Sequence, residues 1–222
     1  MKKIALLIIL ATTVFAFTPT KKTKIIFFGD SITQAGVKPG GYIVRIDSMC
    51  NAAGLKESYE FVGAGIGGNK IYDLYLRMEE DVLAKNPDVV VVYVGVNDVW
   101  HKATSGTGTD ADKFVKFYQA VIKKLKANNI KVLLCTPAAI GEKTDFSNAQ
   151  DGDLNEYSKM IRELAVKNNL PLIDLRKAFL DYNLKNNPEN KPNKILTWDG
   201  VHPNDTGCQL IADAMWKALK AN

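Results

Sequence analysis

Short apolar runs alternate with longer helical patterns along most of this chain. Apolar runs at residues 25–28, 59–62, 89–94, 131–134 and 172–173 predict β-strands, and four of them are rich in β-branched or aromatic side chains. Patterns typical of helices lie between and after these runs, at residues 41–53, 69–85, 111–128, 153–168 and 204–220. Because strand and helix alternate, we expect an α/β fold with a parallel sheet that is covered by helices on both faces.

The residues between these segments support the same boundaries. Proline residues in the stretches 86–88 and 168–171 stop helices just before predicted strands. Asp151 or Asp153 is expected to cap the fourth helix. No low-complexity linker interrupts the pattern, so we expect residues 17–222 to form one domain with a sizeable core.

The first sixteen residues have the features of a secretory signal peptide. Lys2 and Lys3 carry the only charges among the first twenty residues, an apolar run follows, and Val14 and Ala16 occupy the −3 and −1 positions of a cut after Ala16. A short membrane anchor is the alternative, but the apolar run is too short to span about 30 Å of hydrocarbon. We therefore predict a signal peptide at residues 1–16, export to the periplasm or the medium, and no stable membrane anchor after cleavage.

Charge and cysteine content argue against several classes of function. Removing Lys2 and Lys3 from 29 basic residues leaves 27 against 24 acidic ones, and a net charge of about +3 is too weak and scattered for nucleic-acid binding. The three cysteines, Cys50, Cys135 and Cys208, allow at most one disulfide and lack metal-ligand spacing. Cys135 lies in an apolar run and is expected to be a buried thiol, whereas pairing of the other two is left open. With only two histidines and no clustered cysteines, we expect no metal site.

Polar motifs follow the predicted strands. Residues 29–33 follow the first strand, Gly65 follows the second, residues 95–98 follow the third, and residues 199–202 precede the last helix. Ligands of open α/β sheets bind outside the carboxyl ends of the strands. We therefore expect Ser31, Gly65 and Asn97 to converge at one edge of the sheet.

The motifs contain the groups that ester hydrolysis requires. The reaction needs a nucleophile, a base, a carboxylate that orients the base, and donors aimed at the developing oxyanion. Ser31 would be the nucleophile, although a serine in such a turn is also a common cap. His202 would be the base, and Asp199, three residues earlier, would orient it. The backbone N–H groups of Ser31 and Gly65 and the side-chain amide of Asn97 would form the oxyanion hole.

Together these segments resemble the motifs of the SGNH, or GDSL, hydrolase superfamily of lipases and acylhydrolases. The four residues of that name would be Ser31, Gly65, Asn97 and His202, and the resemblance runs over nearly all of residues 25–219. It implies a flavodoxin-like three-layer α/β/α sandwich with a five-stranded parallel sheet in the order 2-1-3-4-5. The implied activity is that of a serine esterase, which needs no cofactor.

Other residues of the same motifs are expected to support the site. Gly29 permits a tight turn after the first strand, and Asp30 can hydrogen-bond that turn. Gly95 belongs to the third motif, in which Asp98 is expected to brace the loop rather than react.

Three ring side chains are candidate substrate contacts. His101 could line the rim of the pocket, or it could be a solvated residue at a helix start. Trp100 and Trp198 adjoin two of the motifs and could flank the site, where indoles stack on sugar rings. The alternative is that both indoles simply pack the loops.

A rival interpretation, a dinucleotide-binding oxidoreductase, comes from residues 63–68, which spell GxGxxG after a strand and before a helix. That motif can bind a dinucleotide, but it requires an acidic residue at the end of the following strand, about twenty residues on. Asp88 has the right count but precedes the strand, and Asp98 ends the strand but lies too far away. A glycan-binding relative without activity is a further alternative.

The favoured interpretation is an exported, monomeric esterase with a small-molecule or glycan ester as substrate. The loops at residues 104–108 and 141–145 are small and polar, and we expect them to be open to water. Open polar loops favour short acyl groups, acetyl above all, on a carbohydrate. A lysophospholipase or thioesterase is the alternative within the same superfamily.

Overall fold

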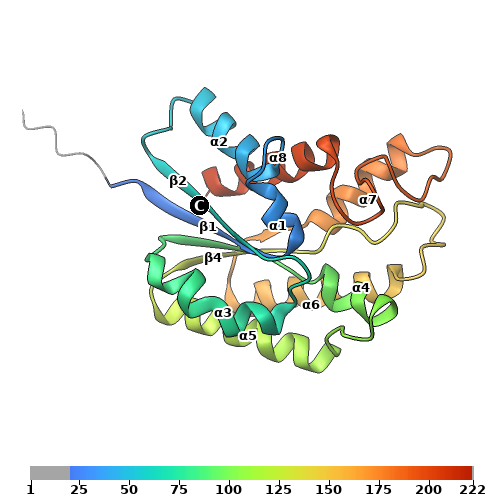
Figure 1. Ribbon diagram of the computed structural model, residues 1–222, viewed down its shortest axis with the longest axis horizontal. Coiled ribbons are helices and arrows are strands. Elements are labelled where there is room, and N and C mark those ends of the chain that lie inside the picture. The colour runs from blue at the N-terminus through green and yellow to red at the C-terminus, as the bar shows by residue number, and fades with distance from the viewer. Residues whose placement is uncertain (1–20, 222) are drawn as a thin grey trace, which may run out of the picture.

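Parallel strands form the centre of the computed structural model, which describes residues 21–221 (Figure 1). They are β1 (Thr23–Gly29), β2 (Tyr59–Gly65), β3 (Val89–Tyr93), β4 (Lys131–Cys135) and β5 (Leu172–Ile173). All neighbouring pairs are parallel, and the strand order is β2-β1-β3-β4-β5. The expected flavodoxin-like order is therefore confirmed.

Helices cover both faces of this sheet, which gives three layers (Figure 1). One layer contains α1 (Ser31–Gly36), α2 (Tyr42–Ala52), α7 (Leu175–Asn186) and α8 (Asp205–Ala221). The other contains α3 (Ile71–Asp81), α4 (Val96–Thr104), α5 (Ala111–Ala127) and α6 (Asp151–Asn168), with a short 3₁₀ turn at Leu83–Lys85. The expected α/β/α sandwich is thus confirmed.

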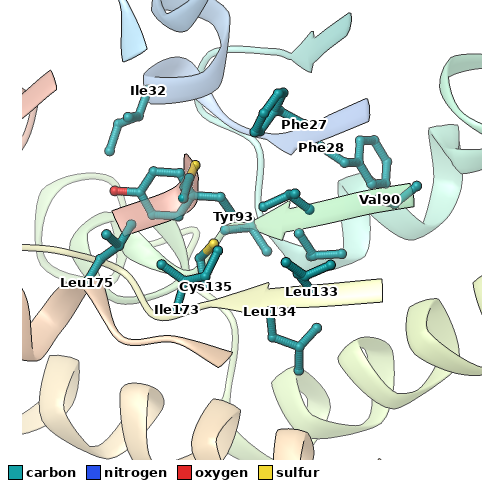
Figure 2. Packing of buried hydrophobic residues seen from close by; sticks show 14 of the residues in the cluster. Phe27, Phe28, Ile32, Val90, Tyr93, Leu133, Leu134, Cys135, Ile173 and Leu175 are labelled. Carbon is teal, nitrogen blue, oxygen red and sulfur yellow. The ribbon is translucent and has the colours of Figure 1, made fainter. Parts of the chain in front are cut away.

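Strand β3 and the second half of β1 are buried on both faces, which explains why these stretches are continuously apolar. Every residue of Val89–Tyr93 is buried, and so are Phe27 and Phe28 of β1. Figure 2 shows Phe27 and Phe28 of β1, Val90 and Tyr93 of β3, and Leu133 and Leu134 of β4 as members of one buried cluster. Burial of so much apolar surface fixes the register of the strands, and therefore fixes the positions of the motifs at their carboxyl ends.

Three helices were not expected from the sequence. Two of them, α1 and α4, begin inside the motifs, where short segments were interpreted as turns. The third, α7, follows directly on the two-residue strand β5, and the Asp174 side chain caps it by accepting the Lys177 backbone N–H at 3.2 Å. Short helices such as α1, with six residues, depend on tertiary packing, which local patterns do not reveal.

The expected cap of α6 is wrong. Gln150 occupies the N-cap position, Asp151 is the first helical residue, and no side chain caps the helix. The carboxylate of Asp151 is instead held by tertiary partners, accepting hydrogen bonds from Arg176 Nη2 at 2.6 Å and Asn148 Nδ2 at 2.9 Å. The Asp151 carboxylate is therefore engaged in a buried ion pair and does not cap the helix.

The predicted signal peptide at residues 1–16 lies outside the described residues. Within residues 21–221, none of the helices combines the length and the apolar character that a membrane span requires. Cys50, Cys135 and Cys208 are all free thiols in the structure, and Cys135 is buried as expected.

Candidate active site

Ser31 lies just beyond the carboxyl end of β1, where it is the first residue of α1. Asp30 forms the N-cap of that helix, because its Oδ1 accepts a hydrogen bond from the Ile32 N–H at 3.0 Å. A side chain on Gly29 would collide with the Tyr93 carbonyl oxygen and the Thr33 side chain, so glycine is needed for this close approach. The Ser31 hydroxyl is thereby held at the sheet edge, partly exposed to solvent.

His202 and Asp199 form a compact pair within one loop and face the serine. His202 Nε2 lies 3.1 Å from Ser31 Oγ, and His202 Nδ1 lies 2.7 Å from Asp199 Oδ2. A neutral imidazole with its proton on Nδ1 satisfies both contacts, because Nδ1 then donates to the carboxylate while Nε2 accepts from the serine. The structure therefore brings the three expected residues into one chain of contacts.

Asp199 also organises the backbone of its own loop. Its Oδ1 accepts hydrogen bonds from the N–H groups of Val201 at 2.9 Å and His202 at 2.8 Å. Burial opposes ionisation of Asp199, but the hydrogen bonds from the His202 ring and backbone outweigh it and hold the pKa of the carboxyl below its ordinary value. The side chain is therefore ionised at neutral pH, as an acceptor for the imidazole must be.

The loop at residues 141–145 contacts the segment that carries Asp199 and His202, and the sequence did not reveal this contact. The Gly141 N–H donates to the Gly200 carbonyl at 2.8 Å. Glu142 is buried, and its two carboxylate oxygens accept the N–H groups of Ile195 at 2.8 Å and Leu196 at 2.7 Å. The expectation that residues 141–145 form a solvated loop is therefore wrong for Glu142, although residues 104–107 are exposed as expected.

Asn97 follows β3 in the first turn of α4, and its side chain is buried. Gly95 precedes it with φ at 131°, a backbone conformation that favours glycine. The Asn97 side-chain amide donates to the Asn69 carbonyl oxygen at 3.1 Å. One amide hydrogen is engaged in this way, and the second remains for another acceptor.

Gly65 is the last residue of β2, and its backbone is oriented by the sheet. The Ile66 N–H donates to the Gly29 carbonyl at 3.3 Å, toward β1. Successive N–H groups of a strand point to opposite sides, so the Gly65 N–H points away from β1, toward the outer edge of the sheet. Gly68 has φ at 77°, and its N–H has no acceptor among the residues that the structure describes.

Two buried carboxyl groups lie under the site. Burial raises the pKa of Asp30 from 3.8 to about 7 and that of Asp98 from 3.8 to about 6. Asp98 Oδ1 accepts the Ile71 N–H at 3.2 Å, at the first residue of α3. This bond fits the expected bracing role of Asp98, because it fixes the end of the loop that contains Gly68.

Of the three candidate rings, Trp100 is the one with a ring contact to the His202 imidazole. The Trp100 and His202 rings form a T-shaped pair, with ring centroids 5.9 Å apart. The centroids of the Trp100 and His101 rings are 5.6 Å apart. A methyl group on Gly68 would meet His101 Cε1 at 3.7 Å, so His101 borders the loop of Gly68. Trp198 precedes Asp199 and is 63% exposed. Its ring is available to a ligand.

The structure argues against dinucleotide binding at residues 63–68. In that motif the glycines form a turn that leads straight into a helix, whereas Gly63, Ala64 and Gly65 belong to β2 and α3 begins only at Ile71. Among residues 21–221, no group of three or more His, Cys, Asp or Glu side chains is arranged to hold a metal ion.

Residues 27–210 match the GDSL-like Lipase/Acylhydrolase family. The crystal structure of an acetyl xylan esterase, AlAXEase, is similar at 70% sequence identity with a TM-score of 0.87, and the match covers 88% of this chain and 99% of that one. LAE5, an alpha/beta hydrolase enzyme from the metagenome of Lake Arreo in Spain, is 26% identical with a TM-score of 0.79, covering 89% of this chain and 95% of that one.

A curated relative is similar over nearly the same length. An acetylxylan esterase of Geobacillus stearothermophilus is 28% identical over 214 residues, which is 88% of this chain and 93% of the relative.

Proposed function

This chain belongs to the GDSL-like lipase/acylhydrolase family and is a carboxylic ester hydrolase, and we propose that it removes acetyl groups from carbohydrate outside the cytoplasm. The observation that carries the proposal is the chain of contacts from Asp199 through His202 to Ser31, at 2.7 and 3.1 Å. The names of the similar acetylxylan esterases support acetyl as the acyl group.

Ser31 is the nucleophile of the proposed reaction. His202 Nε2 accepts the hydroxyl proton as Ser31 Oγ attacks the ester carbonyl, and the protonated imidazole then gives that proton to the departing alcohol oxygen. Water attacks the acyl-serine in the second half of the cycle, again with His202 as base. Asp199 keeps the proton on Nδ1 and stabilises the imidazolium that forms in each half.

The oxyanion is stabilised by backbone and side-chain donors around Ser31. We assign these to the Ser31 N–H, the Asn97 amide hydrogen that Asn69 does not engage, and a glycine N–H from the loop between β2 and α3. The sequence pointed to Gly65 for the last donor, but its N–H points to the outer sheet edge. Gly68 is the better candidate, because its N–H has no acceptor among the described residues and its loop carries the Asn69 carbonyl.

The substrate assignment depends on the exposed face of the site. Trp198 offers a flat apolar surface beside Asp199, and Trp100 contacts His202 by its ring edge. Such surfaces stack on sugar rings, and a short acyl group needs no large apolar groove. A lysophospholipase or thioesterase would need a path for a long acyl chain.

Export and the monomeric state are parts of the same proposal. A signal peptide at residues 1–16 would place the enzyme where it meets plant polysaccharide or its fragments. N-terminal sequencing of the protein recovered from the periplasm or medium should begin at Phe17, and light scattering should give the mass of one chain. Protein found only in the cytoplasm, with residues 1–16 still attached, would contradict export.

A substrate panel tests the acyl and alcohol assignments together. The rate on p-nitrophenyl esters should fall steeply from acetate to octanoate, and acetylated xylan should release acetate. A preference for octanoate, or release of fatty acid from lysophospholipid without acetate release from xylan, would replace the carbohydrate assignment by the lipid one.

A further inference from the structure

One arginine outside the expected motifs contacts both loops that form the proposed site. Arg77 lies on α3, and its side chain is only 14% exposed. Its Nη2 donates to the carbonyl oxygens of Gly29 at 2.7 Å and Ala64 at 3.0 Å, and its Nε donates to Asn69 Oδ1 at 2.6 Å. One guanidinium therefore joins the ends of β1 and β2 to the loop that follows β2.

Each of these partners is close to a residue of the proposed reaction. Gly29 is two residues before Ser31, so its carbonyl fixes the start of the nucleophile turn. Asn69 follows Gly68, and its own carbonyl accepts the amide of Asn97 at 3.1 Å. Arg77 thus holds, from one side, both the turn of the nucleophile and the residue that orients Asn97.

The guanidinium is itself held in a fixed orientation. Its centre lies 4.6 Å from the centroid of the Phe28 ring, and Nη1 forms an ion pair with Asp81 at 2.5 Å on the same helix. The planar guanidinium holds its N–H donors in a rigid fork, whereas the donors of the lysine ammonium rotate at the end of a flexible stem. Phe28 and Asp81 therefore fix the plane of the guanidinium. That plane sets the distances between its three other acceptors, which are the carbonyl oxygens of Gly29 and Ala64 and the side-chain oxygen of Asn69.

We propose that Arg77 is a positioning residue that keeps the Ser31 turn and the loop of Gly68 and Asn69 at the separation that oxyanion stabilisation requires. This proposal rests on the proposed function. Arg77 acts through Gly29 and Asn69 and does not touch the substrate. Loss of its inner contacts lets the two loops separate, which weakens transition-state stabilisation more than ground-state binding.

The test compares Arg77→Met with two matched controls. Asp81→Asn removes only the charge of the outer ion pair, because the amide oxygen can still accept from Arg77 Nη1 and hold the plane, and Arg162→Met removes an arginine that instead binds Asp174. Active sites are counted by complete labelling with a fluorophosphonate, so that kcat for p-nitrophenyl acetate is expressed per active site. A purely structural role would lower the number of active sites and leave this value unchanged.

For Arg77→Met, kcat per active site should fall about 30- to 100-fold while KM changes less than about threefold. Arg77→Lys should fall between wild type and Arg77→Met, and both controls should keep kcat within about twofold. A wild-type kcat per active site in Arg77→Met, or an effect confined to KM, would overturn the proposal.

Two further outcomes keep the test decisive. If Arg77→Met does not fold, Arg77→Lys takes its place, and a wild-type kcat per active site in that variant overturns the positioning role. An active Ser31→Ala variant would refute the proposed function itself. An inactive Ser31→Ala variant beside a normal Arg77→Met variant would refute only the role of Arg77.

Discussion

Replacing Asp199 by asparagine should damage catalysis more than replacing it by alanine. The structure gives Asp199 two separate tasks, because Oδ1 accepts two backbone N–H groups while Oδ2 faces His202 Nδ1 at 2.7 Å. Asparagine keeps an oxygen for the backbone but places an NH₂ group opposite Nδ1. The imidazole must then carry its proton on Nε2, where it donates to Ser31 Oγ and cannot act as a base.

The magnitude follows from this wrong tautomer. We expect kcat of Asp199→Asn to fall on the order of 10⁴-fold, with a melting temperature close to that of wild type because the loop keeps its backbone hydrogen bonds. Asp199→Ala lets water meet Nδ1, so the correct tautomer is accessible and kcat should fall by about 10²- to 10³-fold. The alanine variant loses the backbone contacts as well, and it should therefore melt at the lower temperature.

The assay is steady-state hydrolysis of p-nitrophenyl acetate, with melting followed by circular dichroism. The two variants should rank in opposite orders, asparagine worse for kcat and alanine worse for stability. If alanine were worse on both measures, Asp199 would act mainly by holding the loop, and the tautomer argument would fail.

Three other changes test separate parts of the account. Asn97→Ala should lower kcat by about 10²- to 10³-fold with little change in KM, and an effect mainly on KM would make Asn97 a ground-state contact. Trp198→Ala should leave p-nitrophenyl acetate hydrolysis within about twofold but raise KM for acetylated xylo-oligosaccharide about tenfold, whereas Leu76→Ala, an exposed apolar control, should change neither. Asp98→Asn should flatten the dependence of unfolding free energy on pH. Burial raises the pKa of Asp98 to about 6, so the protonated carboxyl stabilises the folded state fully below about pH 4. This stabilisation, on the order of 2 to 3 kcal/mol, is lost as the pH rises through about 6. Urea denaturation of both proteins from pH 4 to 7 measures this, and parallel curves would refute it.

The parts of this structure that could be predicted depend on short stretches of sequence. The strand Val89–Tyr93 is buried on both faces, so it must be apolar throughout, and the run of valines indicates it. Asp199 and His202 are three residues apart, and their contact is local. The meeting of His202 with Ser31, 171 residues away, was predicted from the groups that ester hydrolysis needs and from the resemblance to the SGNH superfamily, because His202 precedes the last helix and does not follow a strand.

The supporting residues could not be predicted in the same way. Arg77 and Glu142 are charged residues in segments where solvated side chains are usual, and their partners are distant in sequence. The choice between Gly65 and Gly68 depends on where β2 ends and which way each N–H points. Both properties depend on the tertiary structure. A stretch with several glycines does not show which of their N–H groups faces the active site.

The most direct test of the central claim is kcat of purified Ser31→Ala on p-nitrophenyl acetate, with its folding verified by circular dichroism. Because Ser31 is the nucleophile, kcat should fall by about 10³-fold or more while the melting curve stays unchanged. A correctly folded Ser31→Ala protein that keeps more than about a tenth of the wild-type kcat would contradict this role of Ser31.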